Sequence, residues 1–480
     1  MLFNTPEYGI FLLVALAIFW VIQRHLIARL TFLLAASYLF YGAWNPVNMA
    51  LIAFVTLINF GAGLLLSRVS THRGRKGVTA SAAALSLGLL GIFKYLGFLG
   101  DSINVLMQLF HLPASVVFAR PELPVGISFY TFQCLSYTVD VYRRQVEPCR
   151  SPLDFALYAS FFPLVLAGPI MRADQLLPQL RQKPVVDEKT SLLALAFILA
   201  GLMKKMVIAD VLGSQIVNPV YGNLGVATGL HHWLAFYAFP IQLYCDFSGY
   251  CDIAVGSAML FGIRLVDNFN APFLAQSLRE FWQRWHITLS RWLRDYLYIP
   301  LGGNRKGEPR TLMNLLVTMT LGGLWHGASW TYVAWGFYHG ALLALERILA
   351  RYLPFLREVS SGRIAVLVRR VITFHLVALG FVMFRSAGIS QAAVFLKGLV
   401  LPLGPFVKVP IHGIFLGPEK IGVLLFLAIA LHVMKDGTTG RLRERFAALP
   451  SPLIALLFFI ALQAMSMASY MQAPFIYFQF

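Results

Sequence analysis

A single histidine lies among glycines and tryptophans in "LGGLWHGASW", residues 321–330, a stretch otherwise apolar enough to cross a membrane. His326 has Gly322, Gly323 and Gly327 as close neighbours, which we expect to leave space beside its ring. Imidazole is the side chain best suited to take and return a proton near neutral pH. A lone buried histidine is more often hydrogen-bonded packing, but the small neighbours and the membrane depth favour a general base here.

A second histidine lies in the aromatic and basic segment "FLAQSLREFWQRWHITLSRWLRDYLYIP", residues 273–300. Apolar and aromatic side chains recur there at alternating three- and four-residue spacing, namely at Trp282, Trp285, Leu289, Trp292 and Tyr296. This spacing predicts one face of a single helix, with Arg284, Arg291 and Asp295 on the opposite face. An aromatic stripe opposite basic residues is typical of a helix lying in the membrane interface, with His286 at the edge of the stripe.

Each polar feature of this segment has two interpretations. His286 is either a hydrogen-bonded part of an interfacial anchor or a functional group directed into the protein, and the spacing favours neither. Arg284, Arg291 and Arg294 either bind anionic lipid or capture the phosphates of a cytosolic substrate through bidentate contacts. Lipid is the favoured partner for most of them.

The apolar segment 241–262 carries an unusual number of polar residues, at Gln242, Tyr244, Asp246, Ser248, Tyr250 and Asp252. A carboxylate at the bilayer centre costs about 2.5–3.5 kcal/mol, so these groups should face the interior of a helix bundle or water. Gly249 allows close backbone approach of another helix. The residues either line a substrate path or form a buried hydrogen-bond network that fixes helix packing.

Composition indicates an all-α polytopic membrane protein. The 480 residues are 58% hydrophobic and 12% charged, and long apolar runs recur along the chain. Only helices or closed barrels satisfy backbone groups in lipid, and barrel strands would need short alternating segments. We expect twelve crossings near residues 9–22, 30–44, 47–67, 79–99, 124–141, 190–212, 231–262, 311–330, 331–347, 366–384, 421–434 and 452–472. No soluble domain is apparent, so 1–480 is expected to be one membrane domain.

The basic residues behind the formal charge of +18 are distributed along the chain in a pattern that predicts the membrane topology. Lysine and arginine cluster in alternate connections, namely 68–76, 143–150, 279–310, 347–370 and 435–445. The positive-inside rule makes these connections cytoplasmic and both termini external, so nucleic acid is not an expected partner. The apolar segment 155–170 breaks this alternation and contains Pro163 and Pro169, which predicts a re-entrant hairpin.

The four cysteines give no sign of a metal site. Cys134, Cys149, Cys245 and Cys251 form no CxxC pair and have no zinc-type histidine grouping nearby. We expect neither a bound metal nor a disulfide framework.

Several motifs together resemble the membrane-bound O-acyltransferase family. They are "YCDFSGYCDIAVGSAMLFGI", "NFNAPF", "REFWQRWHITLSRWLRDYLYIPLGGNR" and "LGGLWHGASWTYVAWGFYHG", and the motifs of the core span residues 124–345. The chain is most similar to the bacterial branch that includes the alginate O-acetyltransferase membrane subunit.

This resemblance implies a fold and an activity. The fold would be a ring of tilted helices, with re-entrant and interfacial helices, around a central tunnel in a bacterial inner membrane. His326 would be the catalytic histidine and His286 a second catalytic position. His339 is a weaker catalytic candidate. Substrate binding would involve Trp325 together with Tyr244, Asp246, Ser248, Tyr250, Asp252, Arg284, Arg291 and Arg294.

The resemblance also implies substrates and partners. The donor would be a cytosolic thioester, acetyl-CoA or an acyl carrier, with no bound cofactor. The acceptor would be a hydroxyl of an extracytoplasmic polysaccharide such as alginate, reached with an extracytoplasmic acetyltransferase partner. Three alternatives remain open: a D-alanyltransferase, a lipid or protein O-acyltransferase of the same family, and a secondary transporter with a midplane histidine.

Overall fold

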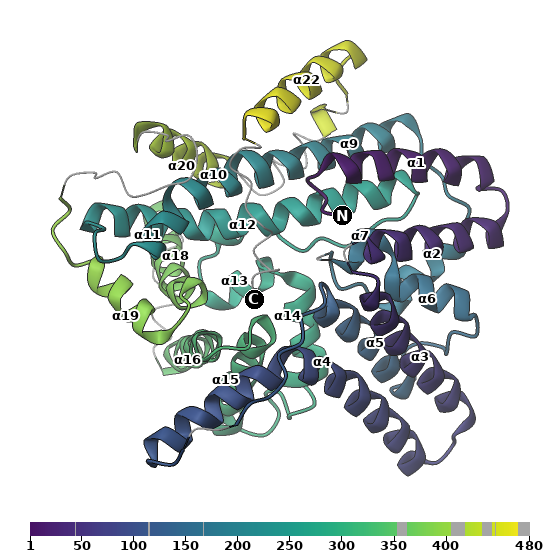
Figure 1. Cartoon of the computed structure of the whole chain (residues 1–480), viewed down its shortest axis with the longest axis horizontal. Coiled ribbons are helices and arrows are strands. Elements are labelled where there is room, and N and C mark those ends of the chain that lie inside the picture. The colour runs from purple at the N-terminus through teal and green to yellow at the C-terminus, as the bar shows by residue number, and fades with distance from the viewer. Residues whose placement is uncertain are drawn as a thin grey trace. The chain divides into compact units, whose positions relative to one another are not determined.

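The computed structural model describes residues 1–43, 45–113, 116–166, 168–352, 362–404, 418–433, 444–446 and 448–468 (Figure 1). Regular structure in these ranges is helical and contains no strand, which confirms the all-α fold class. The chain forms two compact units, Met1–Ala194 with Ala254–Val266, and Leu195–Ile253 with Asp267–Phe480. The single domain over 1–480 stays a prediction.

Most helices of the first unit precede residue 182. They are α1 (Pro6–Ile22), α2 (Leu26–Gly42), α3 (Val47–Arg68), α4 (His72–Leu109), α5 (Ile127–Tyr142), α6 (Pro152–Ser160), α7 (Phe162–Val165) and α8 (Ala173–Arg181).

The second unit contains most of the polar motifs. It begins within a long helical run composed of α9 (Glu188–Leu202), η1 (Met203–Ala209), α10 (Asp210–Leu212), η2 (Gly213–Val217) and α11 (Asn218–Gly222). It continues with most of α12 (Gly229–Leu260), then η3 (Pro272–Leu274), α13 (Leu278–Arg284), α14 (Ile287–Leu293), η4 (Arg294–Tyr298), α15 (Glu308–His326), α16 (Trp330–Tyr352), α18 (Arg363–Arg385), α19 (Ile389–Gly398), α20 (Pro418–Val433) and α22 (Ser451–Ala468).

Each of the twelve predicted crossings falls on one of these helices or helical runs. Within the described residues, four are long and apolar enough to span a bilayer: Val47–Arg68, His72–Leu109, Glu188–Gly222 and Arg363–Arg385. The membrane character is therefore confirmed, whereas the number of crossings and the central tunnel stay predictions.

The segment 155–170 is interrupted, as its prolines predict. It forms α6 and α7, both too short to cross a bilayer, with a break at Phe161. Protein groups satisfy polar atoms around the break: the Ser37 hydroxyl accepts from the Phe162 backbone N–H at 3.1 Å, and the Tyr158 hydroxyl lies 3.1 Å from the Met171 carbonyl. Irregular backbone in an apolar protein requires such partners. Re-entry into the membrane stays a prediction.

The prediction of one continuous helix through residues 278–298 is wrong. The chain forms α13, α14 and the π-helical turn η4, and the helix breaks at His286, which has left-handed backbone angles (φ 42°). Trp285 and Leu289 are buried, whereas the Trp292 ring packs against the Tyr296 ring, so the proposed stripe does not form one interfacial surface. Residue spacing could not reveal this break because tertiary contacts hold it.

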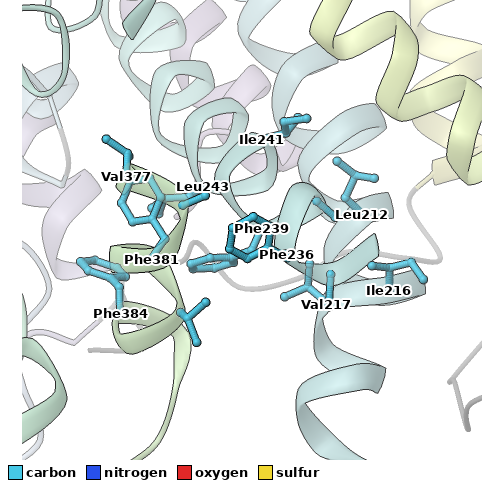
Figure 2. Close-up of a cluster of buried hydrophobic side chains, with 14 of the residues drawn as sticks. Leu212, Ile216, Val217, Phe236, Phe239, Ile241, Leu243, Val377, Phe381 and Phe384 are labelled. Atoms are coloured by element: carbon cyan, nitrogen blue, oxygen red, sulfur yellow. The ribbon is translucent and has the colours of Figure 1, made fainter. Parts of the chain in front are cut away.

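An apolar core fixes helices of the second unit around α12. Figure 2 shows side chains of three helical regions meeting, with Leu212, Ile216, Val217, Phe236, Phe239, Ile241, Leu243, Val377, Phe381 and Phe384 labelled. On another part of α12 the backbone approaches α9, since a β-carbon on Gly249 would lie 2.7 Å from the Gly201 carbonyl oxygen. The close approach expected at Gly249 is therefore present.

Glycines also join α15 to α16, which lie side by side (Figure 1). A β-carbon on Gly336 would lie 2.3 Å from the Met319 carbonyl oxygen, and one on Gly323 would lie 2.2 Å from the Tyr332 carbonyl oxygen. Tyr332 also occupies the space beside Gly327. These glycines thus bring backbones into contact and do not leave open space beside His326, contrary to the expectation from the sequence.

Adding one methyl group should disturb the close packing of α15 against α16. Gly336→Ala is expected to lower the free energy of unfolding by about 1–3 kcal/mol, because the new β-carbon meets rigid backbone. Thermal unfolding of the purified protein in detergent measures the change. Gly88→Ala is the matched control, since nothing lies within 4 Å of its new β-carbon. Equal melting temperatures for the two variants would contradict the close packing.

Candidate active site

His326 is the last residue of α15 and is held among aromatic rings. It is 4% exposed, and its ring centroid lies 5.1 Å from the Trp335 ring and 5.4 Å from the Phe384 ring, both in edge-on arrangements. Trp335 and Phe384 also pack on each other, at 5.2 Å. Contacts from α16 and α18 thus restrict rotation of the imidazole, as a positioned general base requires.

His286 lies next to His326. The two ring centroids are 6.3 Å apart, and Trp325 contacts both rings, at 5.9 Å from His286 and 5.0 Å from His326. His286 is fully buried, and this burial lowers the pKa of its imidazole to about 3. The structure therefore brings both predicted catalytic residues and Trp325 together, with a neutral imidazole at position 286.

Asn268 holds the helix break at His286. Its backbone carbonyl accepts from the Ile287 N–H at 2.9 Å. Its side-chain oxygen lies 3.2 Å from Nδ1 of His286, 3.2 Å from the Thr288 backbone N–H and 2.9 Å from the Thr288 hydroxyl. The sequence analysis did not identify Asn268 as a functional residue, although it begins the motif "NFNAPF".

His339 belongs to the wall behind His326. It is fully buried and packs against Trp335 at 5.0 Å and Trp282 at 5.3 Å. Trp335 thus contacts both His326 and His339. His339 therefore has a supporting position, with the Trp335 ring between it and His326.

The polar run in α12 meets two lysines that the sequence analysis missed. Nζ of Lys205 lies 2.7 Å from both Asp210 and Asp246, and all three side chains are nearly inaccessible to solvent. Nζ of Lys204 lies 2.7 Å from Asp252. These ion pairs link α12 to the preceding helical run and support the interpretation of a buried packing network. A binding role for Asp246 and Asp252 stays a prediction.

The hydroxyl-bearing candidates lie in the same part of α12. The Tyr244 ring packs against Phe269, Phe273 and Trp285, and Nζ of Lys204 lies 5.5 Å from its centre. Ser248 and Tyr250 are buried, and Nζ of Lys205 lies 6.0 Å from the Tyr250 ring centre. Tyr244 and Tyr250 therefore lie beside the lysine and aspartate network.

A cavity of about 1090 Å³ opens beside the histidine pair in the second unit. Five arginines and two glutamates line it: Arg279, Arg291, Arg294, Arg347, Arg351, Glu308 and Glu346. Glu308 pairs with Arg347 at 2.5 Å and Arg351 at 3.2 Å, and Glu346 accepts from the Leu278 backbone N–H at 2.7 Å. The lining therefore has an excess of positive charge.

Residues lining the cavity also neighbour the histidine pair, although neither histidine lines it. Its lining includes Ile287, which follows His286, and Trp282, which packs on Trp335 at 5.7 Å. It also includes Met319, about two helical turns before His326 in α15. Of the predicted basic residues, Arg291 and Arg294 line this cavity, whereas Arg284 pairs with Glu280 at 2.9 Å outside it.

Comparison with known proteins identifies the family. Residues 129–385 match the model of the membrane-bound O-acyltransferase family, and this range includes both histidines, Asn268 and most of the cavity lining. The chain belongs to this family. The prediction that it is an O-acyltransferase is therefore confirmed.

Relatives of this acyltransferase are named for different activities. A probable alginate O-acetylase of Pseudomonas putida is 37% identical over 471 residues, covering 93% of this chain and 94% of that protein. A peptidoglycan O-acetyltransferase of Helicobacter pylori is 32% identical, covering 83% of this chain and 80% of that protein. A teichoic acid D-alanyltransferase of Bacillus subtilis is 28% identical, covering 54% and 68% respectively.

Among the described residues, no group of three His, Cys, Asp or Glu side chains lies close enough to hold an ion. Proton transfer and hydrogen bonding by the histidines are the chemistry that the geometry of the acyltransferase site offers.

Removing the buried lysine tests the packing role of the α12 network. Lys205→Met leaves Asp210 and Asp246 without this cation, and we expect it to lower the free energy of unfolding by about 3–5 kcal/mol. The triple variant with Asp210→Asn and Asp246→Asn should recover most of the loss. The measurement is thermal unfolding, with Lys189→Met as an exposed control in the same helical run. A stable Lys205→Met protein would contradict the packing role.

Proposed function

We propose that this acyltransferase moves an acetyl group from a cytosolic thioester to a hydroxyl of an extracytoplasmic polysaccharide, in the inner membrane of a bacterium. The observation that carries the proposal is the buried pair His326 and His286 beside an arginine-lined cavity of about 1090 Å³. The cavity provides volume and charge for an anionic thioester, and the pair provides a base near its inner wall.

The cavity lining supports a phosphate-bearing donor. Arg279, Arg291 and Arg294 belong to the segment predicted to be cytoplasmic from its basic residues. Guanidinium groups bind phosphate through paired, charge-assisted hydrogen bonds. Acetyl-CoA and an acyl-carrier phosphopantetheine both combine phosphate with a thioester, so both match this lining. The donor is a substrate, and no resident cofactor takes part.

His326 acts as the general base in the proposed reaction. It takes the proton from the acceptor hydroxyl, whose oxygen attacks the thioester carbonyl carbon. The tetrahedral intermediate then collapses, the carbon–sulfur bond breaks, and the proton passes from His326 to the leaving sulfur. The products are an ester and a free thiol. General base catalysis of this kind typically contributes about 10²–10⁴ in rate.

The position of His326 supports arrival of the acceptor from the opposite side. It ends α15, whose 19 residues correspond to about 28 Å of helix, close to the thickness of a bilayer core. Arg310 lies at the other end of this helix, in the segment predicted to be cytoplasmic. An acetyl group could therefore cross the membrane while the donor remains in the cytosol.

Relatives support a polymer acceptor. The Pseudomonas putida and Helicobacter pylori proteins are named for acetylation of alginate and peptidoglycan. We propose a polysaccharide of the alginate type, because that relative covers nearly the whole chain. An extracytoplasmic acetyltransferase partner would complete transfer onto the polymer, and surrounding lipids would contact the apolar helices.

Label transfer tests the reaction. Membranes containing the wild-type protein should release thiol from acetyl-labelled coenzyme A and pass label to acceptor in envelope extract. His326→Ala should reduce this rate at least about 10²-fold, because the base is removed. His25→Ala is the control, since His25 is exposed in the first unit.

Three results would contradict the proposal in different ways. Full activity of correctly folded His326→Ala would exclude the assigned base. Transfer only from a D-alanyl carrier would replace the acetyl donor, and solute flux without thioester consumption would support a transporter.

Arginine substitutions test donor binding separately from chemistry. Arg291→Ala should raise the KM for acetyl-CoA about 10-fold or more with little change in kcat, because a phosphate contact is worth roughly 1.5–3 kcal/mol. Arg310→Ala is the matched control, because Arg310 is exposed in the same basic segment but does not line the cavity. Equal KM values for the two variants would exclude Arg291 from donor binding.

A further inference from the structure

Asn268 makes an unusual set of contacts for one side chain. Its Oδ1 lies within hydrogen-bond distance of the Thr288 backbone N–H, the Thr288 hydroxyl and Nδ1 of His286. Its Nδ2 donates to Sγ of Cys251 at 3.4 Å. All of these groups are buried. One amide therefore connects the end of α12 to the helix break that presents His286.

The backbone of Thr288 fixes the orientation of this amide. A backbone N–H can only donate, so the Asn268 atom facing it must be the carbonyl oxygen and not the NH₂ group. The same oxygen faces Nδ1 of His286 at 3.2 Å. A carbonyl oxygen can only accept, so Nδ1 of His286 must carry a proton.

We propose that Asn268 is a positioning residue that fixes His286 as the Nδ1–H tautomer, so that Nε2 offers a lone pair to the active site. Nε2 then accepts a hydrogen bond and cannot donate one. His286 would therefore accept a hydrogen bond from the ring N–H of His326, whose other nitrogen stays available as the base, and other groups would stabilise the oxyanion of the tetrahedral intermediate.

The backbone at His286 supports a specific orientation for its ring. A non-glycine residue with φ near 42° is uncommon and persists only where surrounding contacts impose it. Asn268 imposes it through the Ile287 N–H and the Thr288 N–H together. The same contacts that break the helix therefore set the direction of the imidazole, which also packs edge-on against Phe247 at 4.7 Å.

The tautomer assignment stands on these contacts, whereas the role of the Nε2 lone pair rests on the proposed acyl transfer. Asn268, Phe247, Trp325 and His326 contact the His286 ring, and His326 is titratable. A substitution of Asn268 should therefore alter the charge state of His286 directly.

Nuclear magnetic resonance tests the tautomer without any activity measurement. Carbon–nitrogen correlations of histidine-labelled protein in lipid nanodiscs show whether the protonated ring nitrogen is bonded to Cγ, as Nδ1 is, or to Cδ2, as Nε2 is. His286→Gln assigns the signal by its disappearance. We expect the protonated nitrogen of His286 to be Nδ1, and a protonated Nε2 in the neutral ring would overturn the proposal.

Asn268→Asp tests the functional consequence. The carboxylate keeps both Thr288 contacts and the acceptor for Nδ1, but its charge favours the imidazolium form of His286. The acid limb of the rate profile for acetyl transfer should therefore move up by about 1–3 pH units. A merely structural role would lower stability without this shift.

Matched controls separate the His286 contact from the rest of the network. Thr288→Val and Cys251→Ala each remove one partner of Asn268 and leave the His286 contact. We expect both to keep the Nδ1–H tautomer and the wild-type pH profile. A wild-type profile for folded Asn268→Asp would overturn the positioning role. An inactive wild-type protein with the Nδ1–H tautomer would instead overturn the proposed acyl transfer and support the tautomer assignment.

Discussion

The hydrogen bonds of Asn268 determine how the second unit can present two histidines to each other. In a largely apolar chain, a helix break leaves backbone groups that cost several kcal/mol unless protein atoms satisfy them. The backbone carbonyl of Asn268 accepts from the Ile287 N–H, and its side-chain oxygen accepts from the Thr288 N–H and reaches the His286 ring. The break would be costly without this side chain, and a continuous helix would point position 286 elsewhere.

Aromatic packing positions the partner histidine. His326 is the last residue of α15, and the close glycine contacts between α15 and α16 bring Trp335 against its ring. Phe384, which belongs to the apolar core in Figure 2, closes the other side. Since the wall is aromatic, it fixes the ring while leaving the imidazole as the polar group available for chemistry.

The sequence predicted the helical class and the interruption of segment 155–170, whereas the catalytic roles of His326 and His286 stay predictions. It failed where distant residues decide local structure. Aromatic spacing predicted one helix through His286, because periodicity cannot detect a break imposed from Asn268. The glycines near His326 suggested open space, because sequence does not show that Tyr332 and Gly336 occupy it. Lys205 was overlooked because its partner Asp246 lies on another helix.

Burial explains why positive side chains have two different functions in this chain. Lys205 is 1% exposed and has two carboxylates at 2.7 Å, since an isolated ammonium would pay a large desolvation cost there. Arg291 and Arg294 are exposed along the cavity, and among the described residues only Arg294 has an adjacent carboxylate partner there, Asp295 at 2.7 Å. The net charge of +18 combines both groups and cannot distinguish them. Only the solvent exposure of each cation, together with its carboxylate partners, separates residues that hold helices together from residues able to bind an anionic donor.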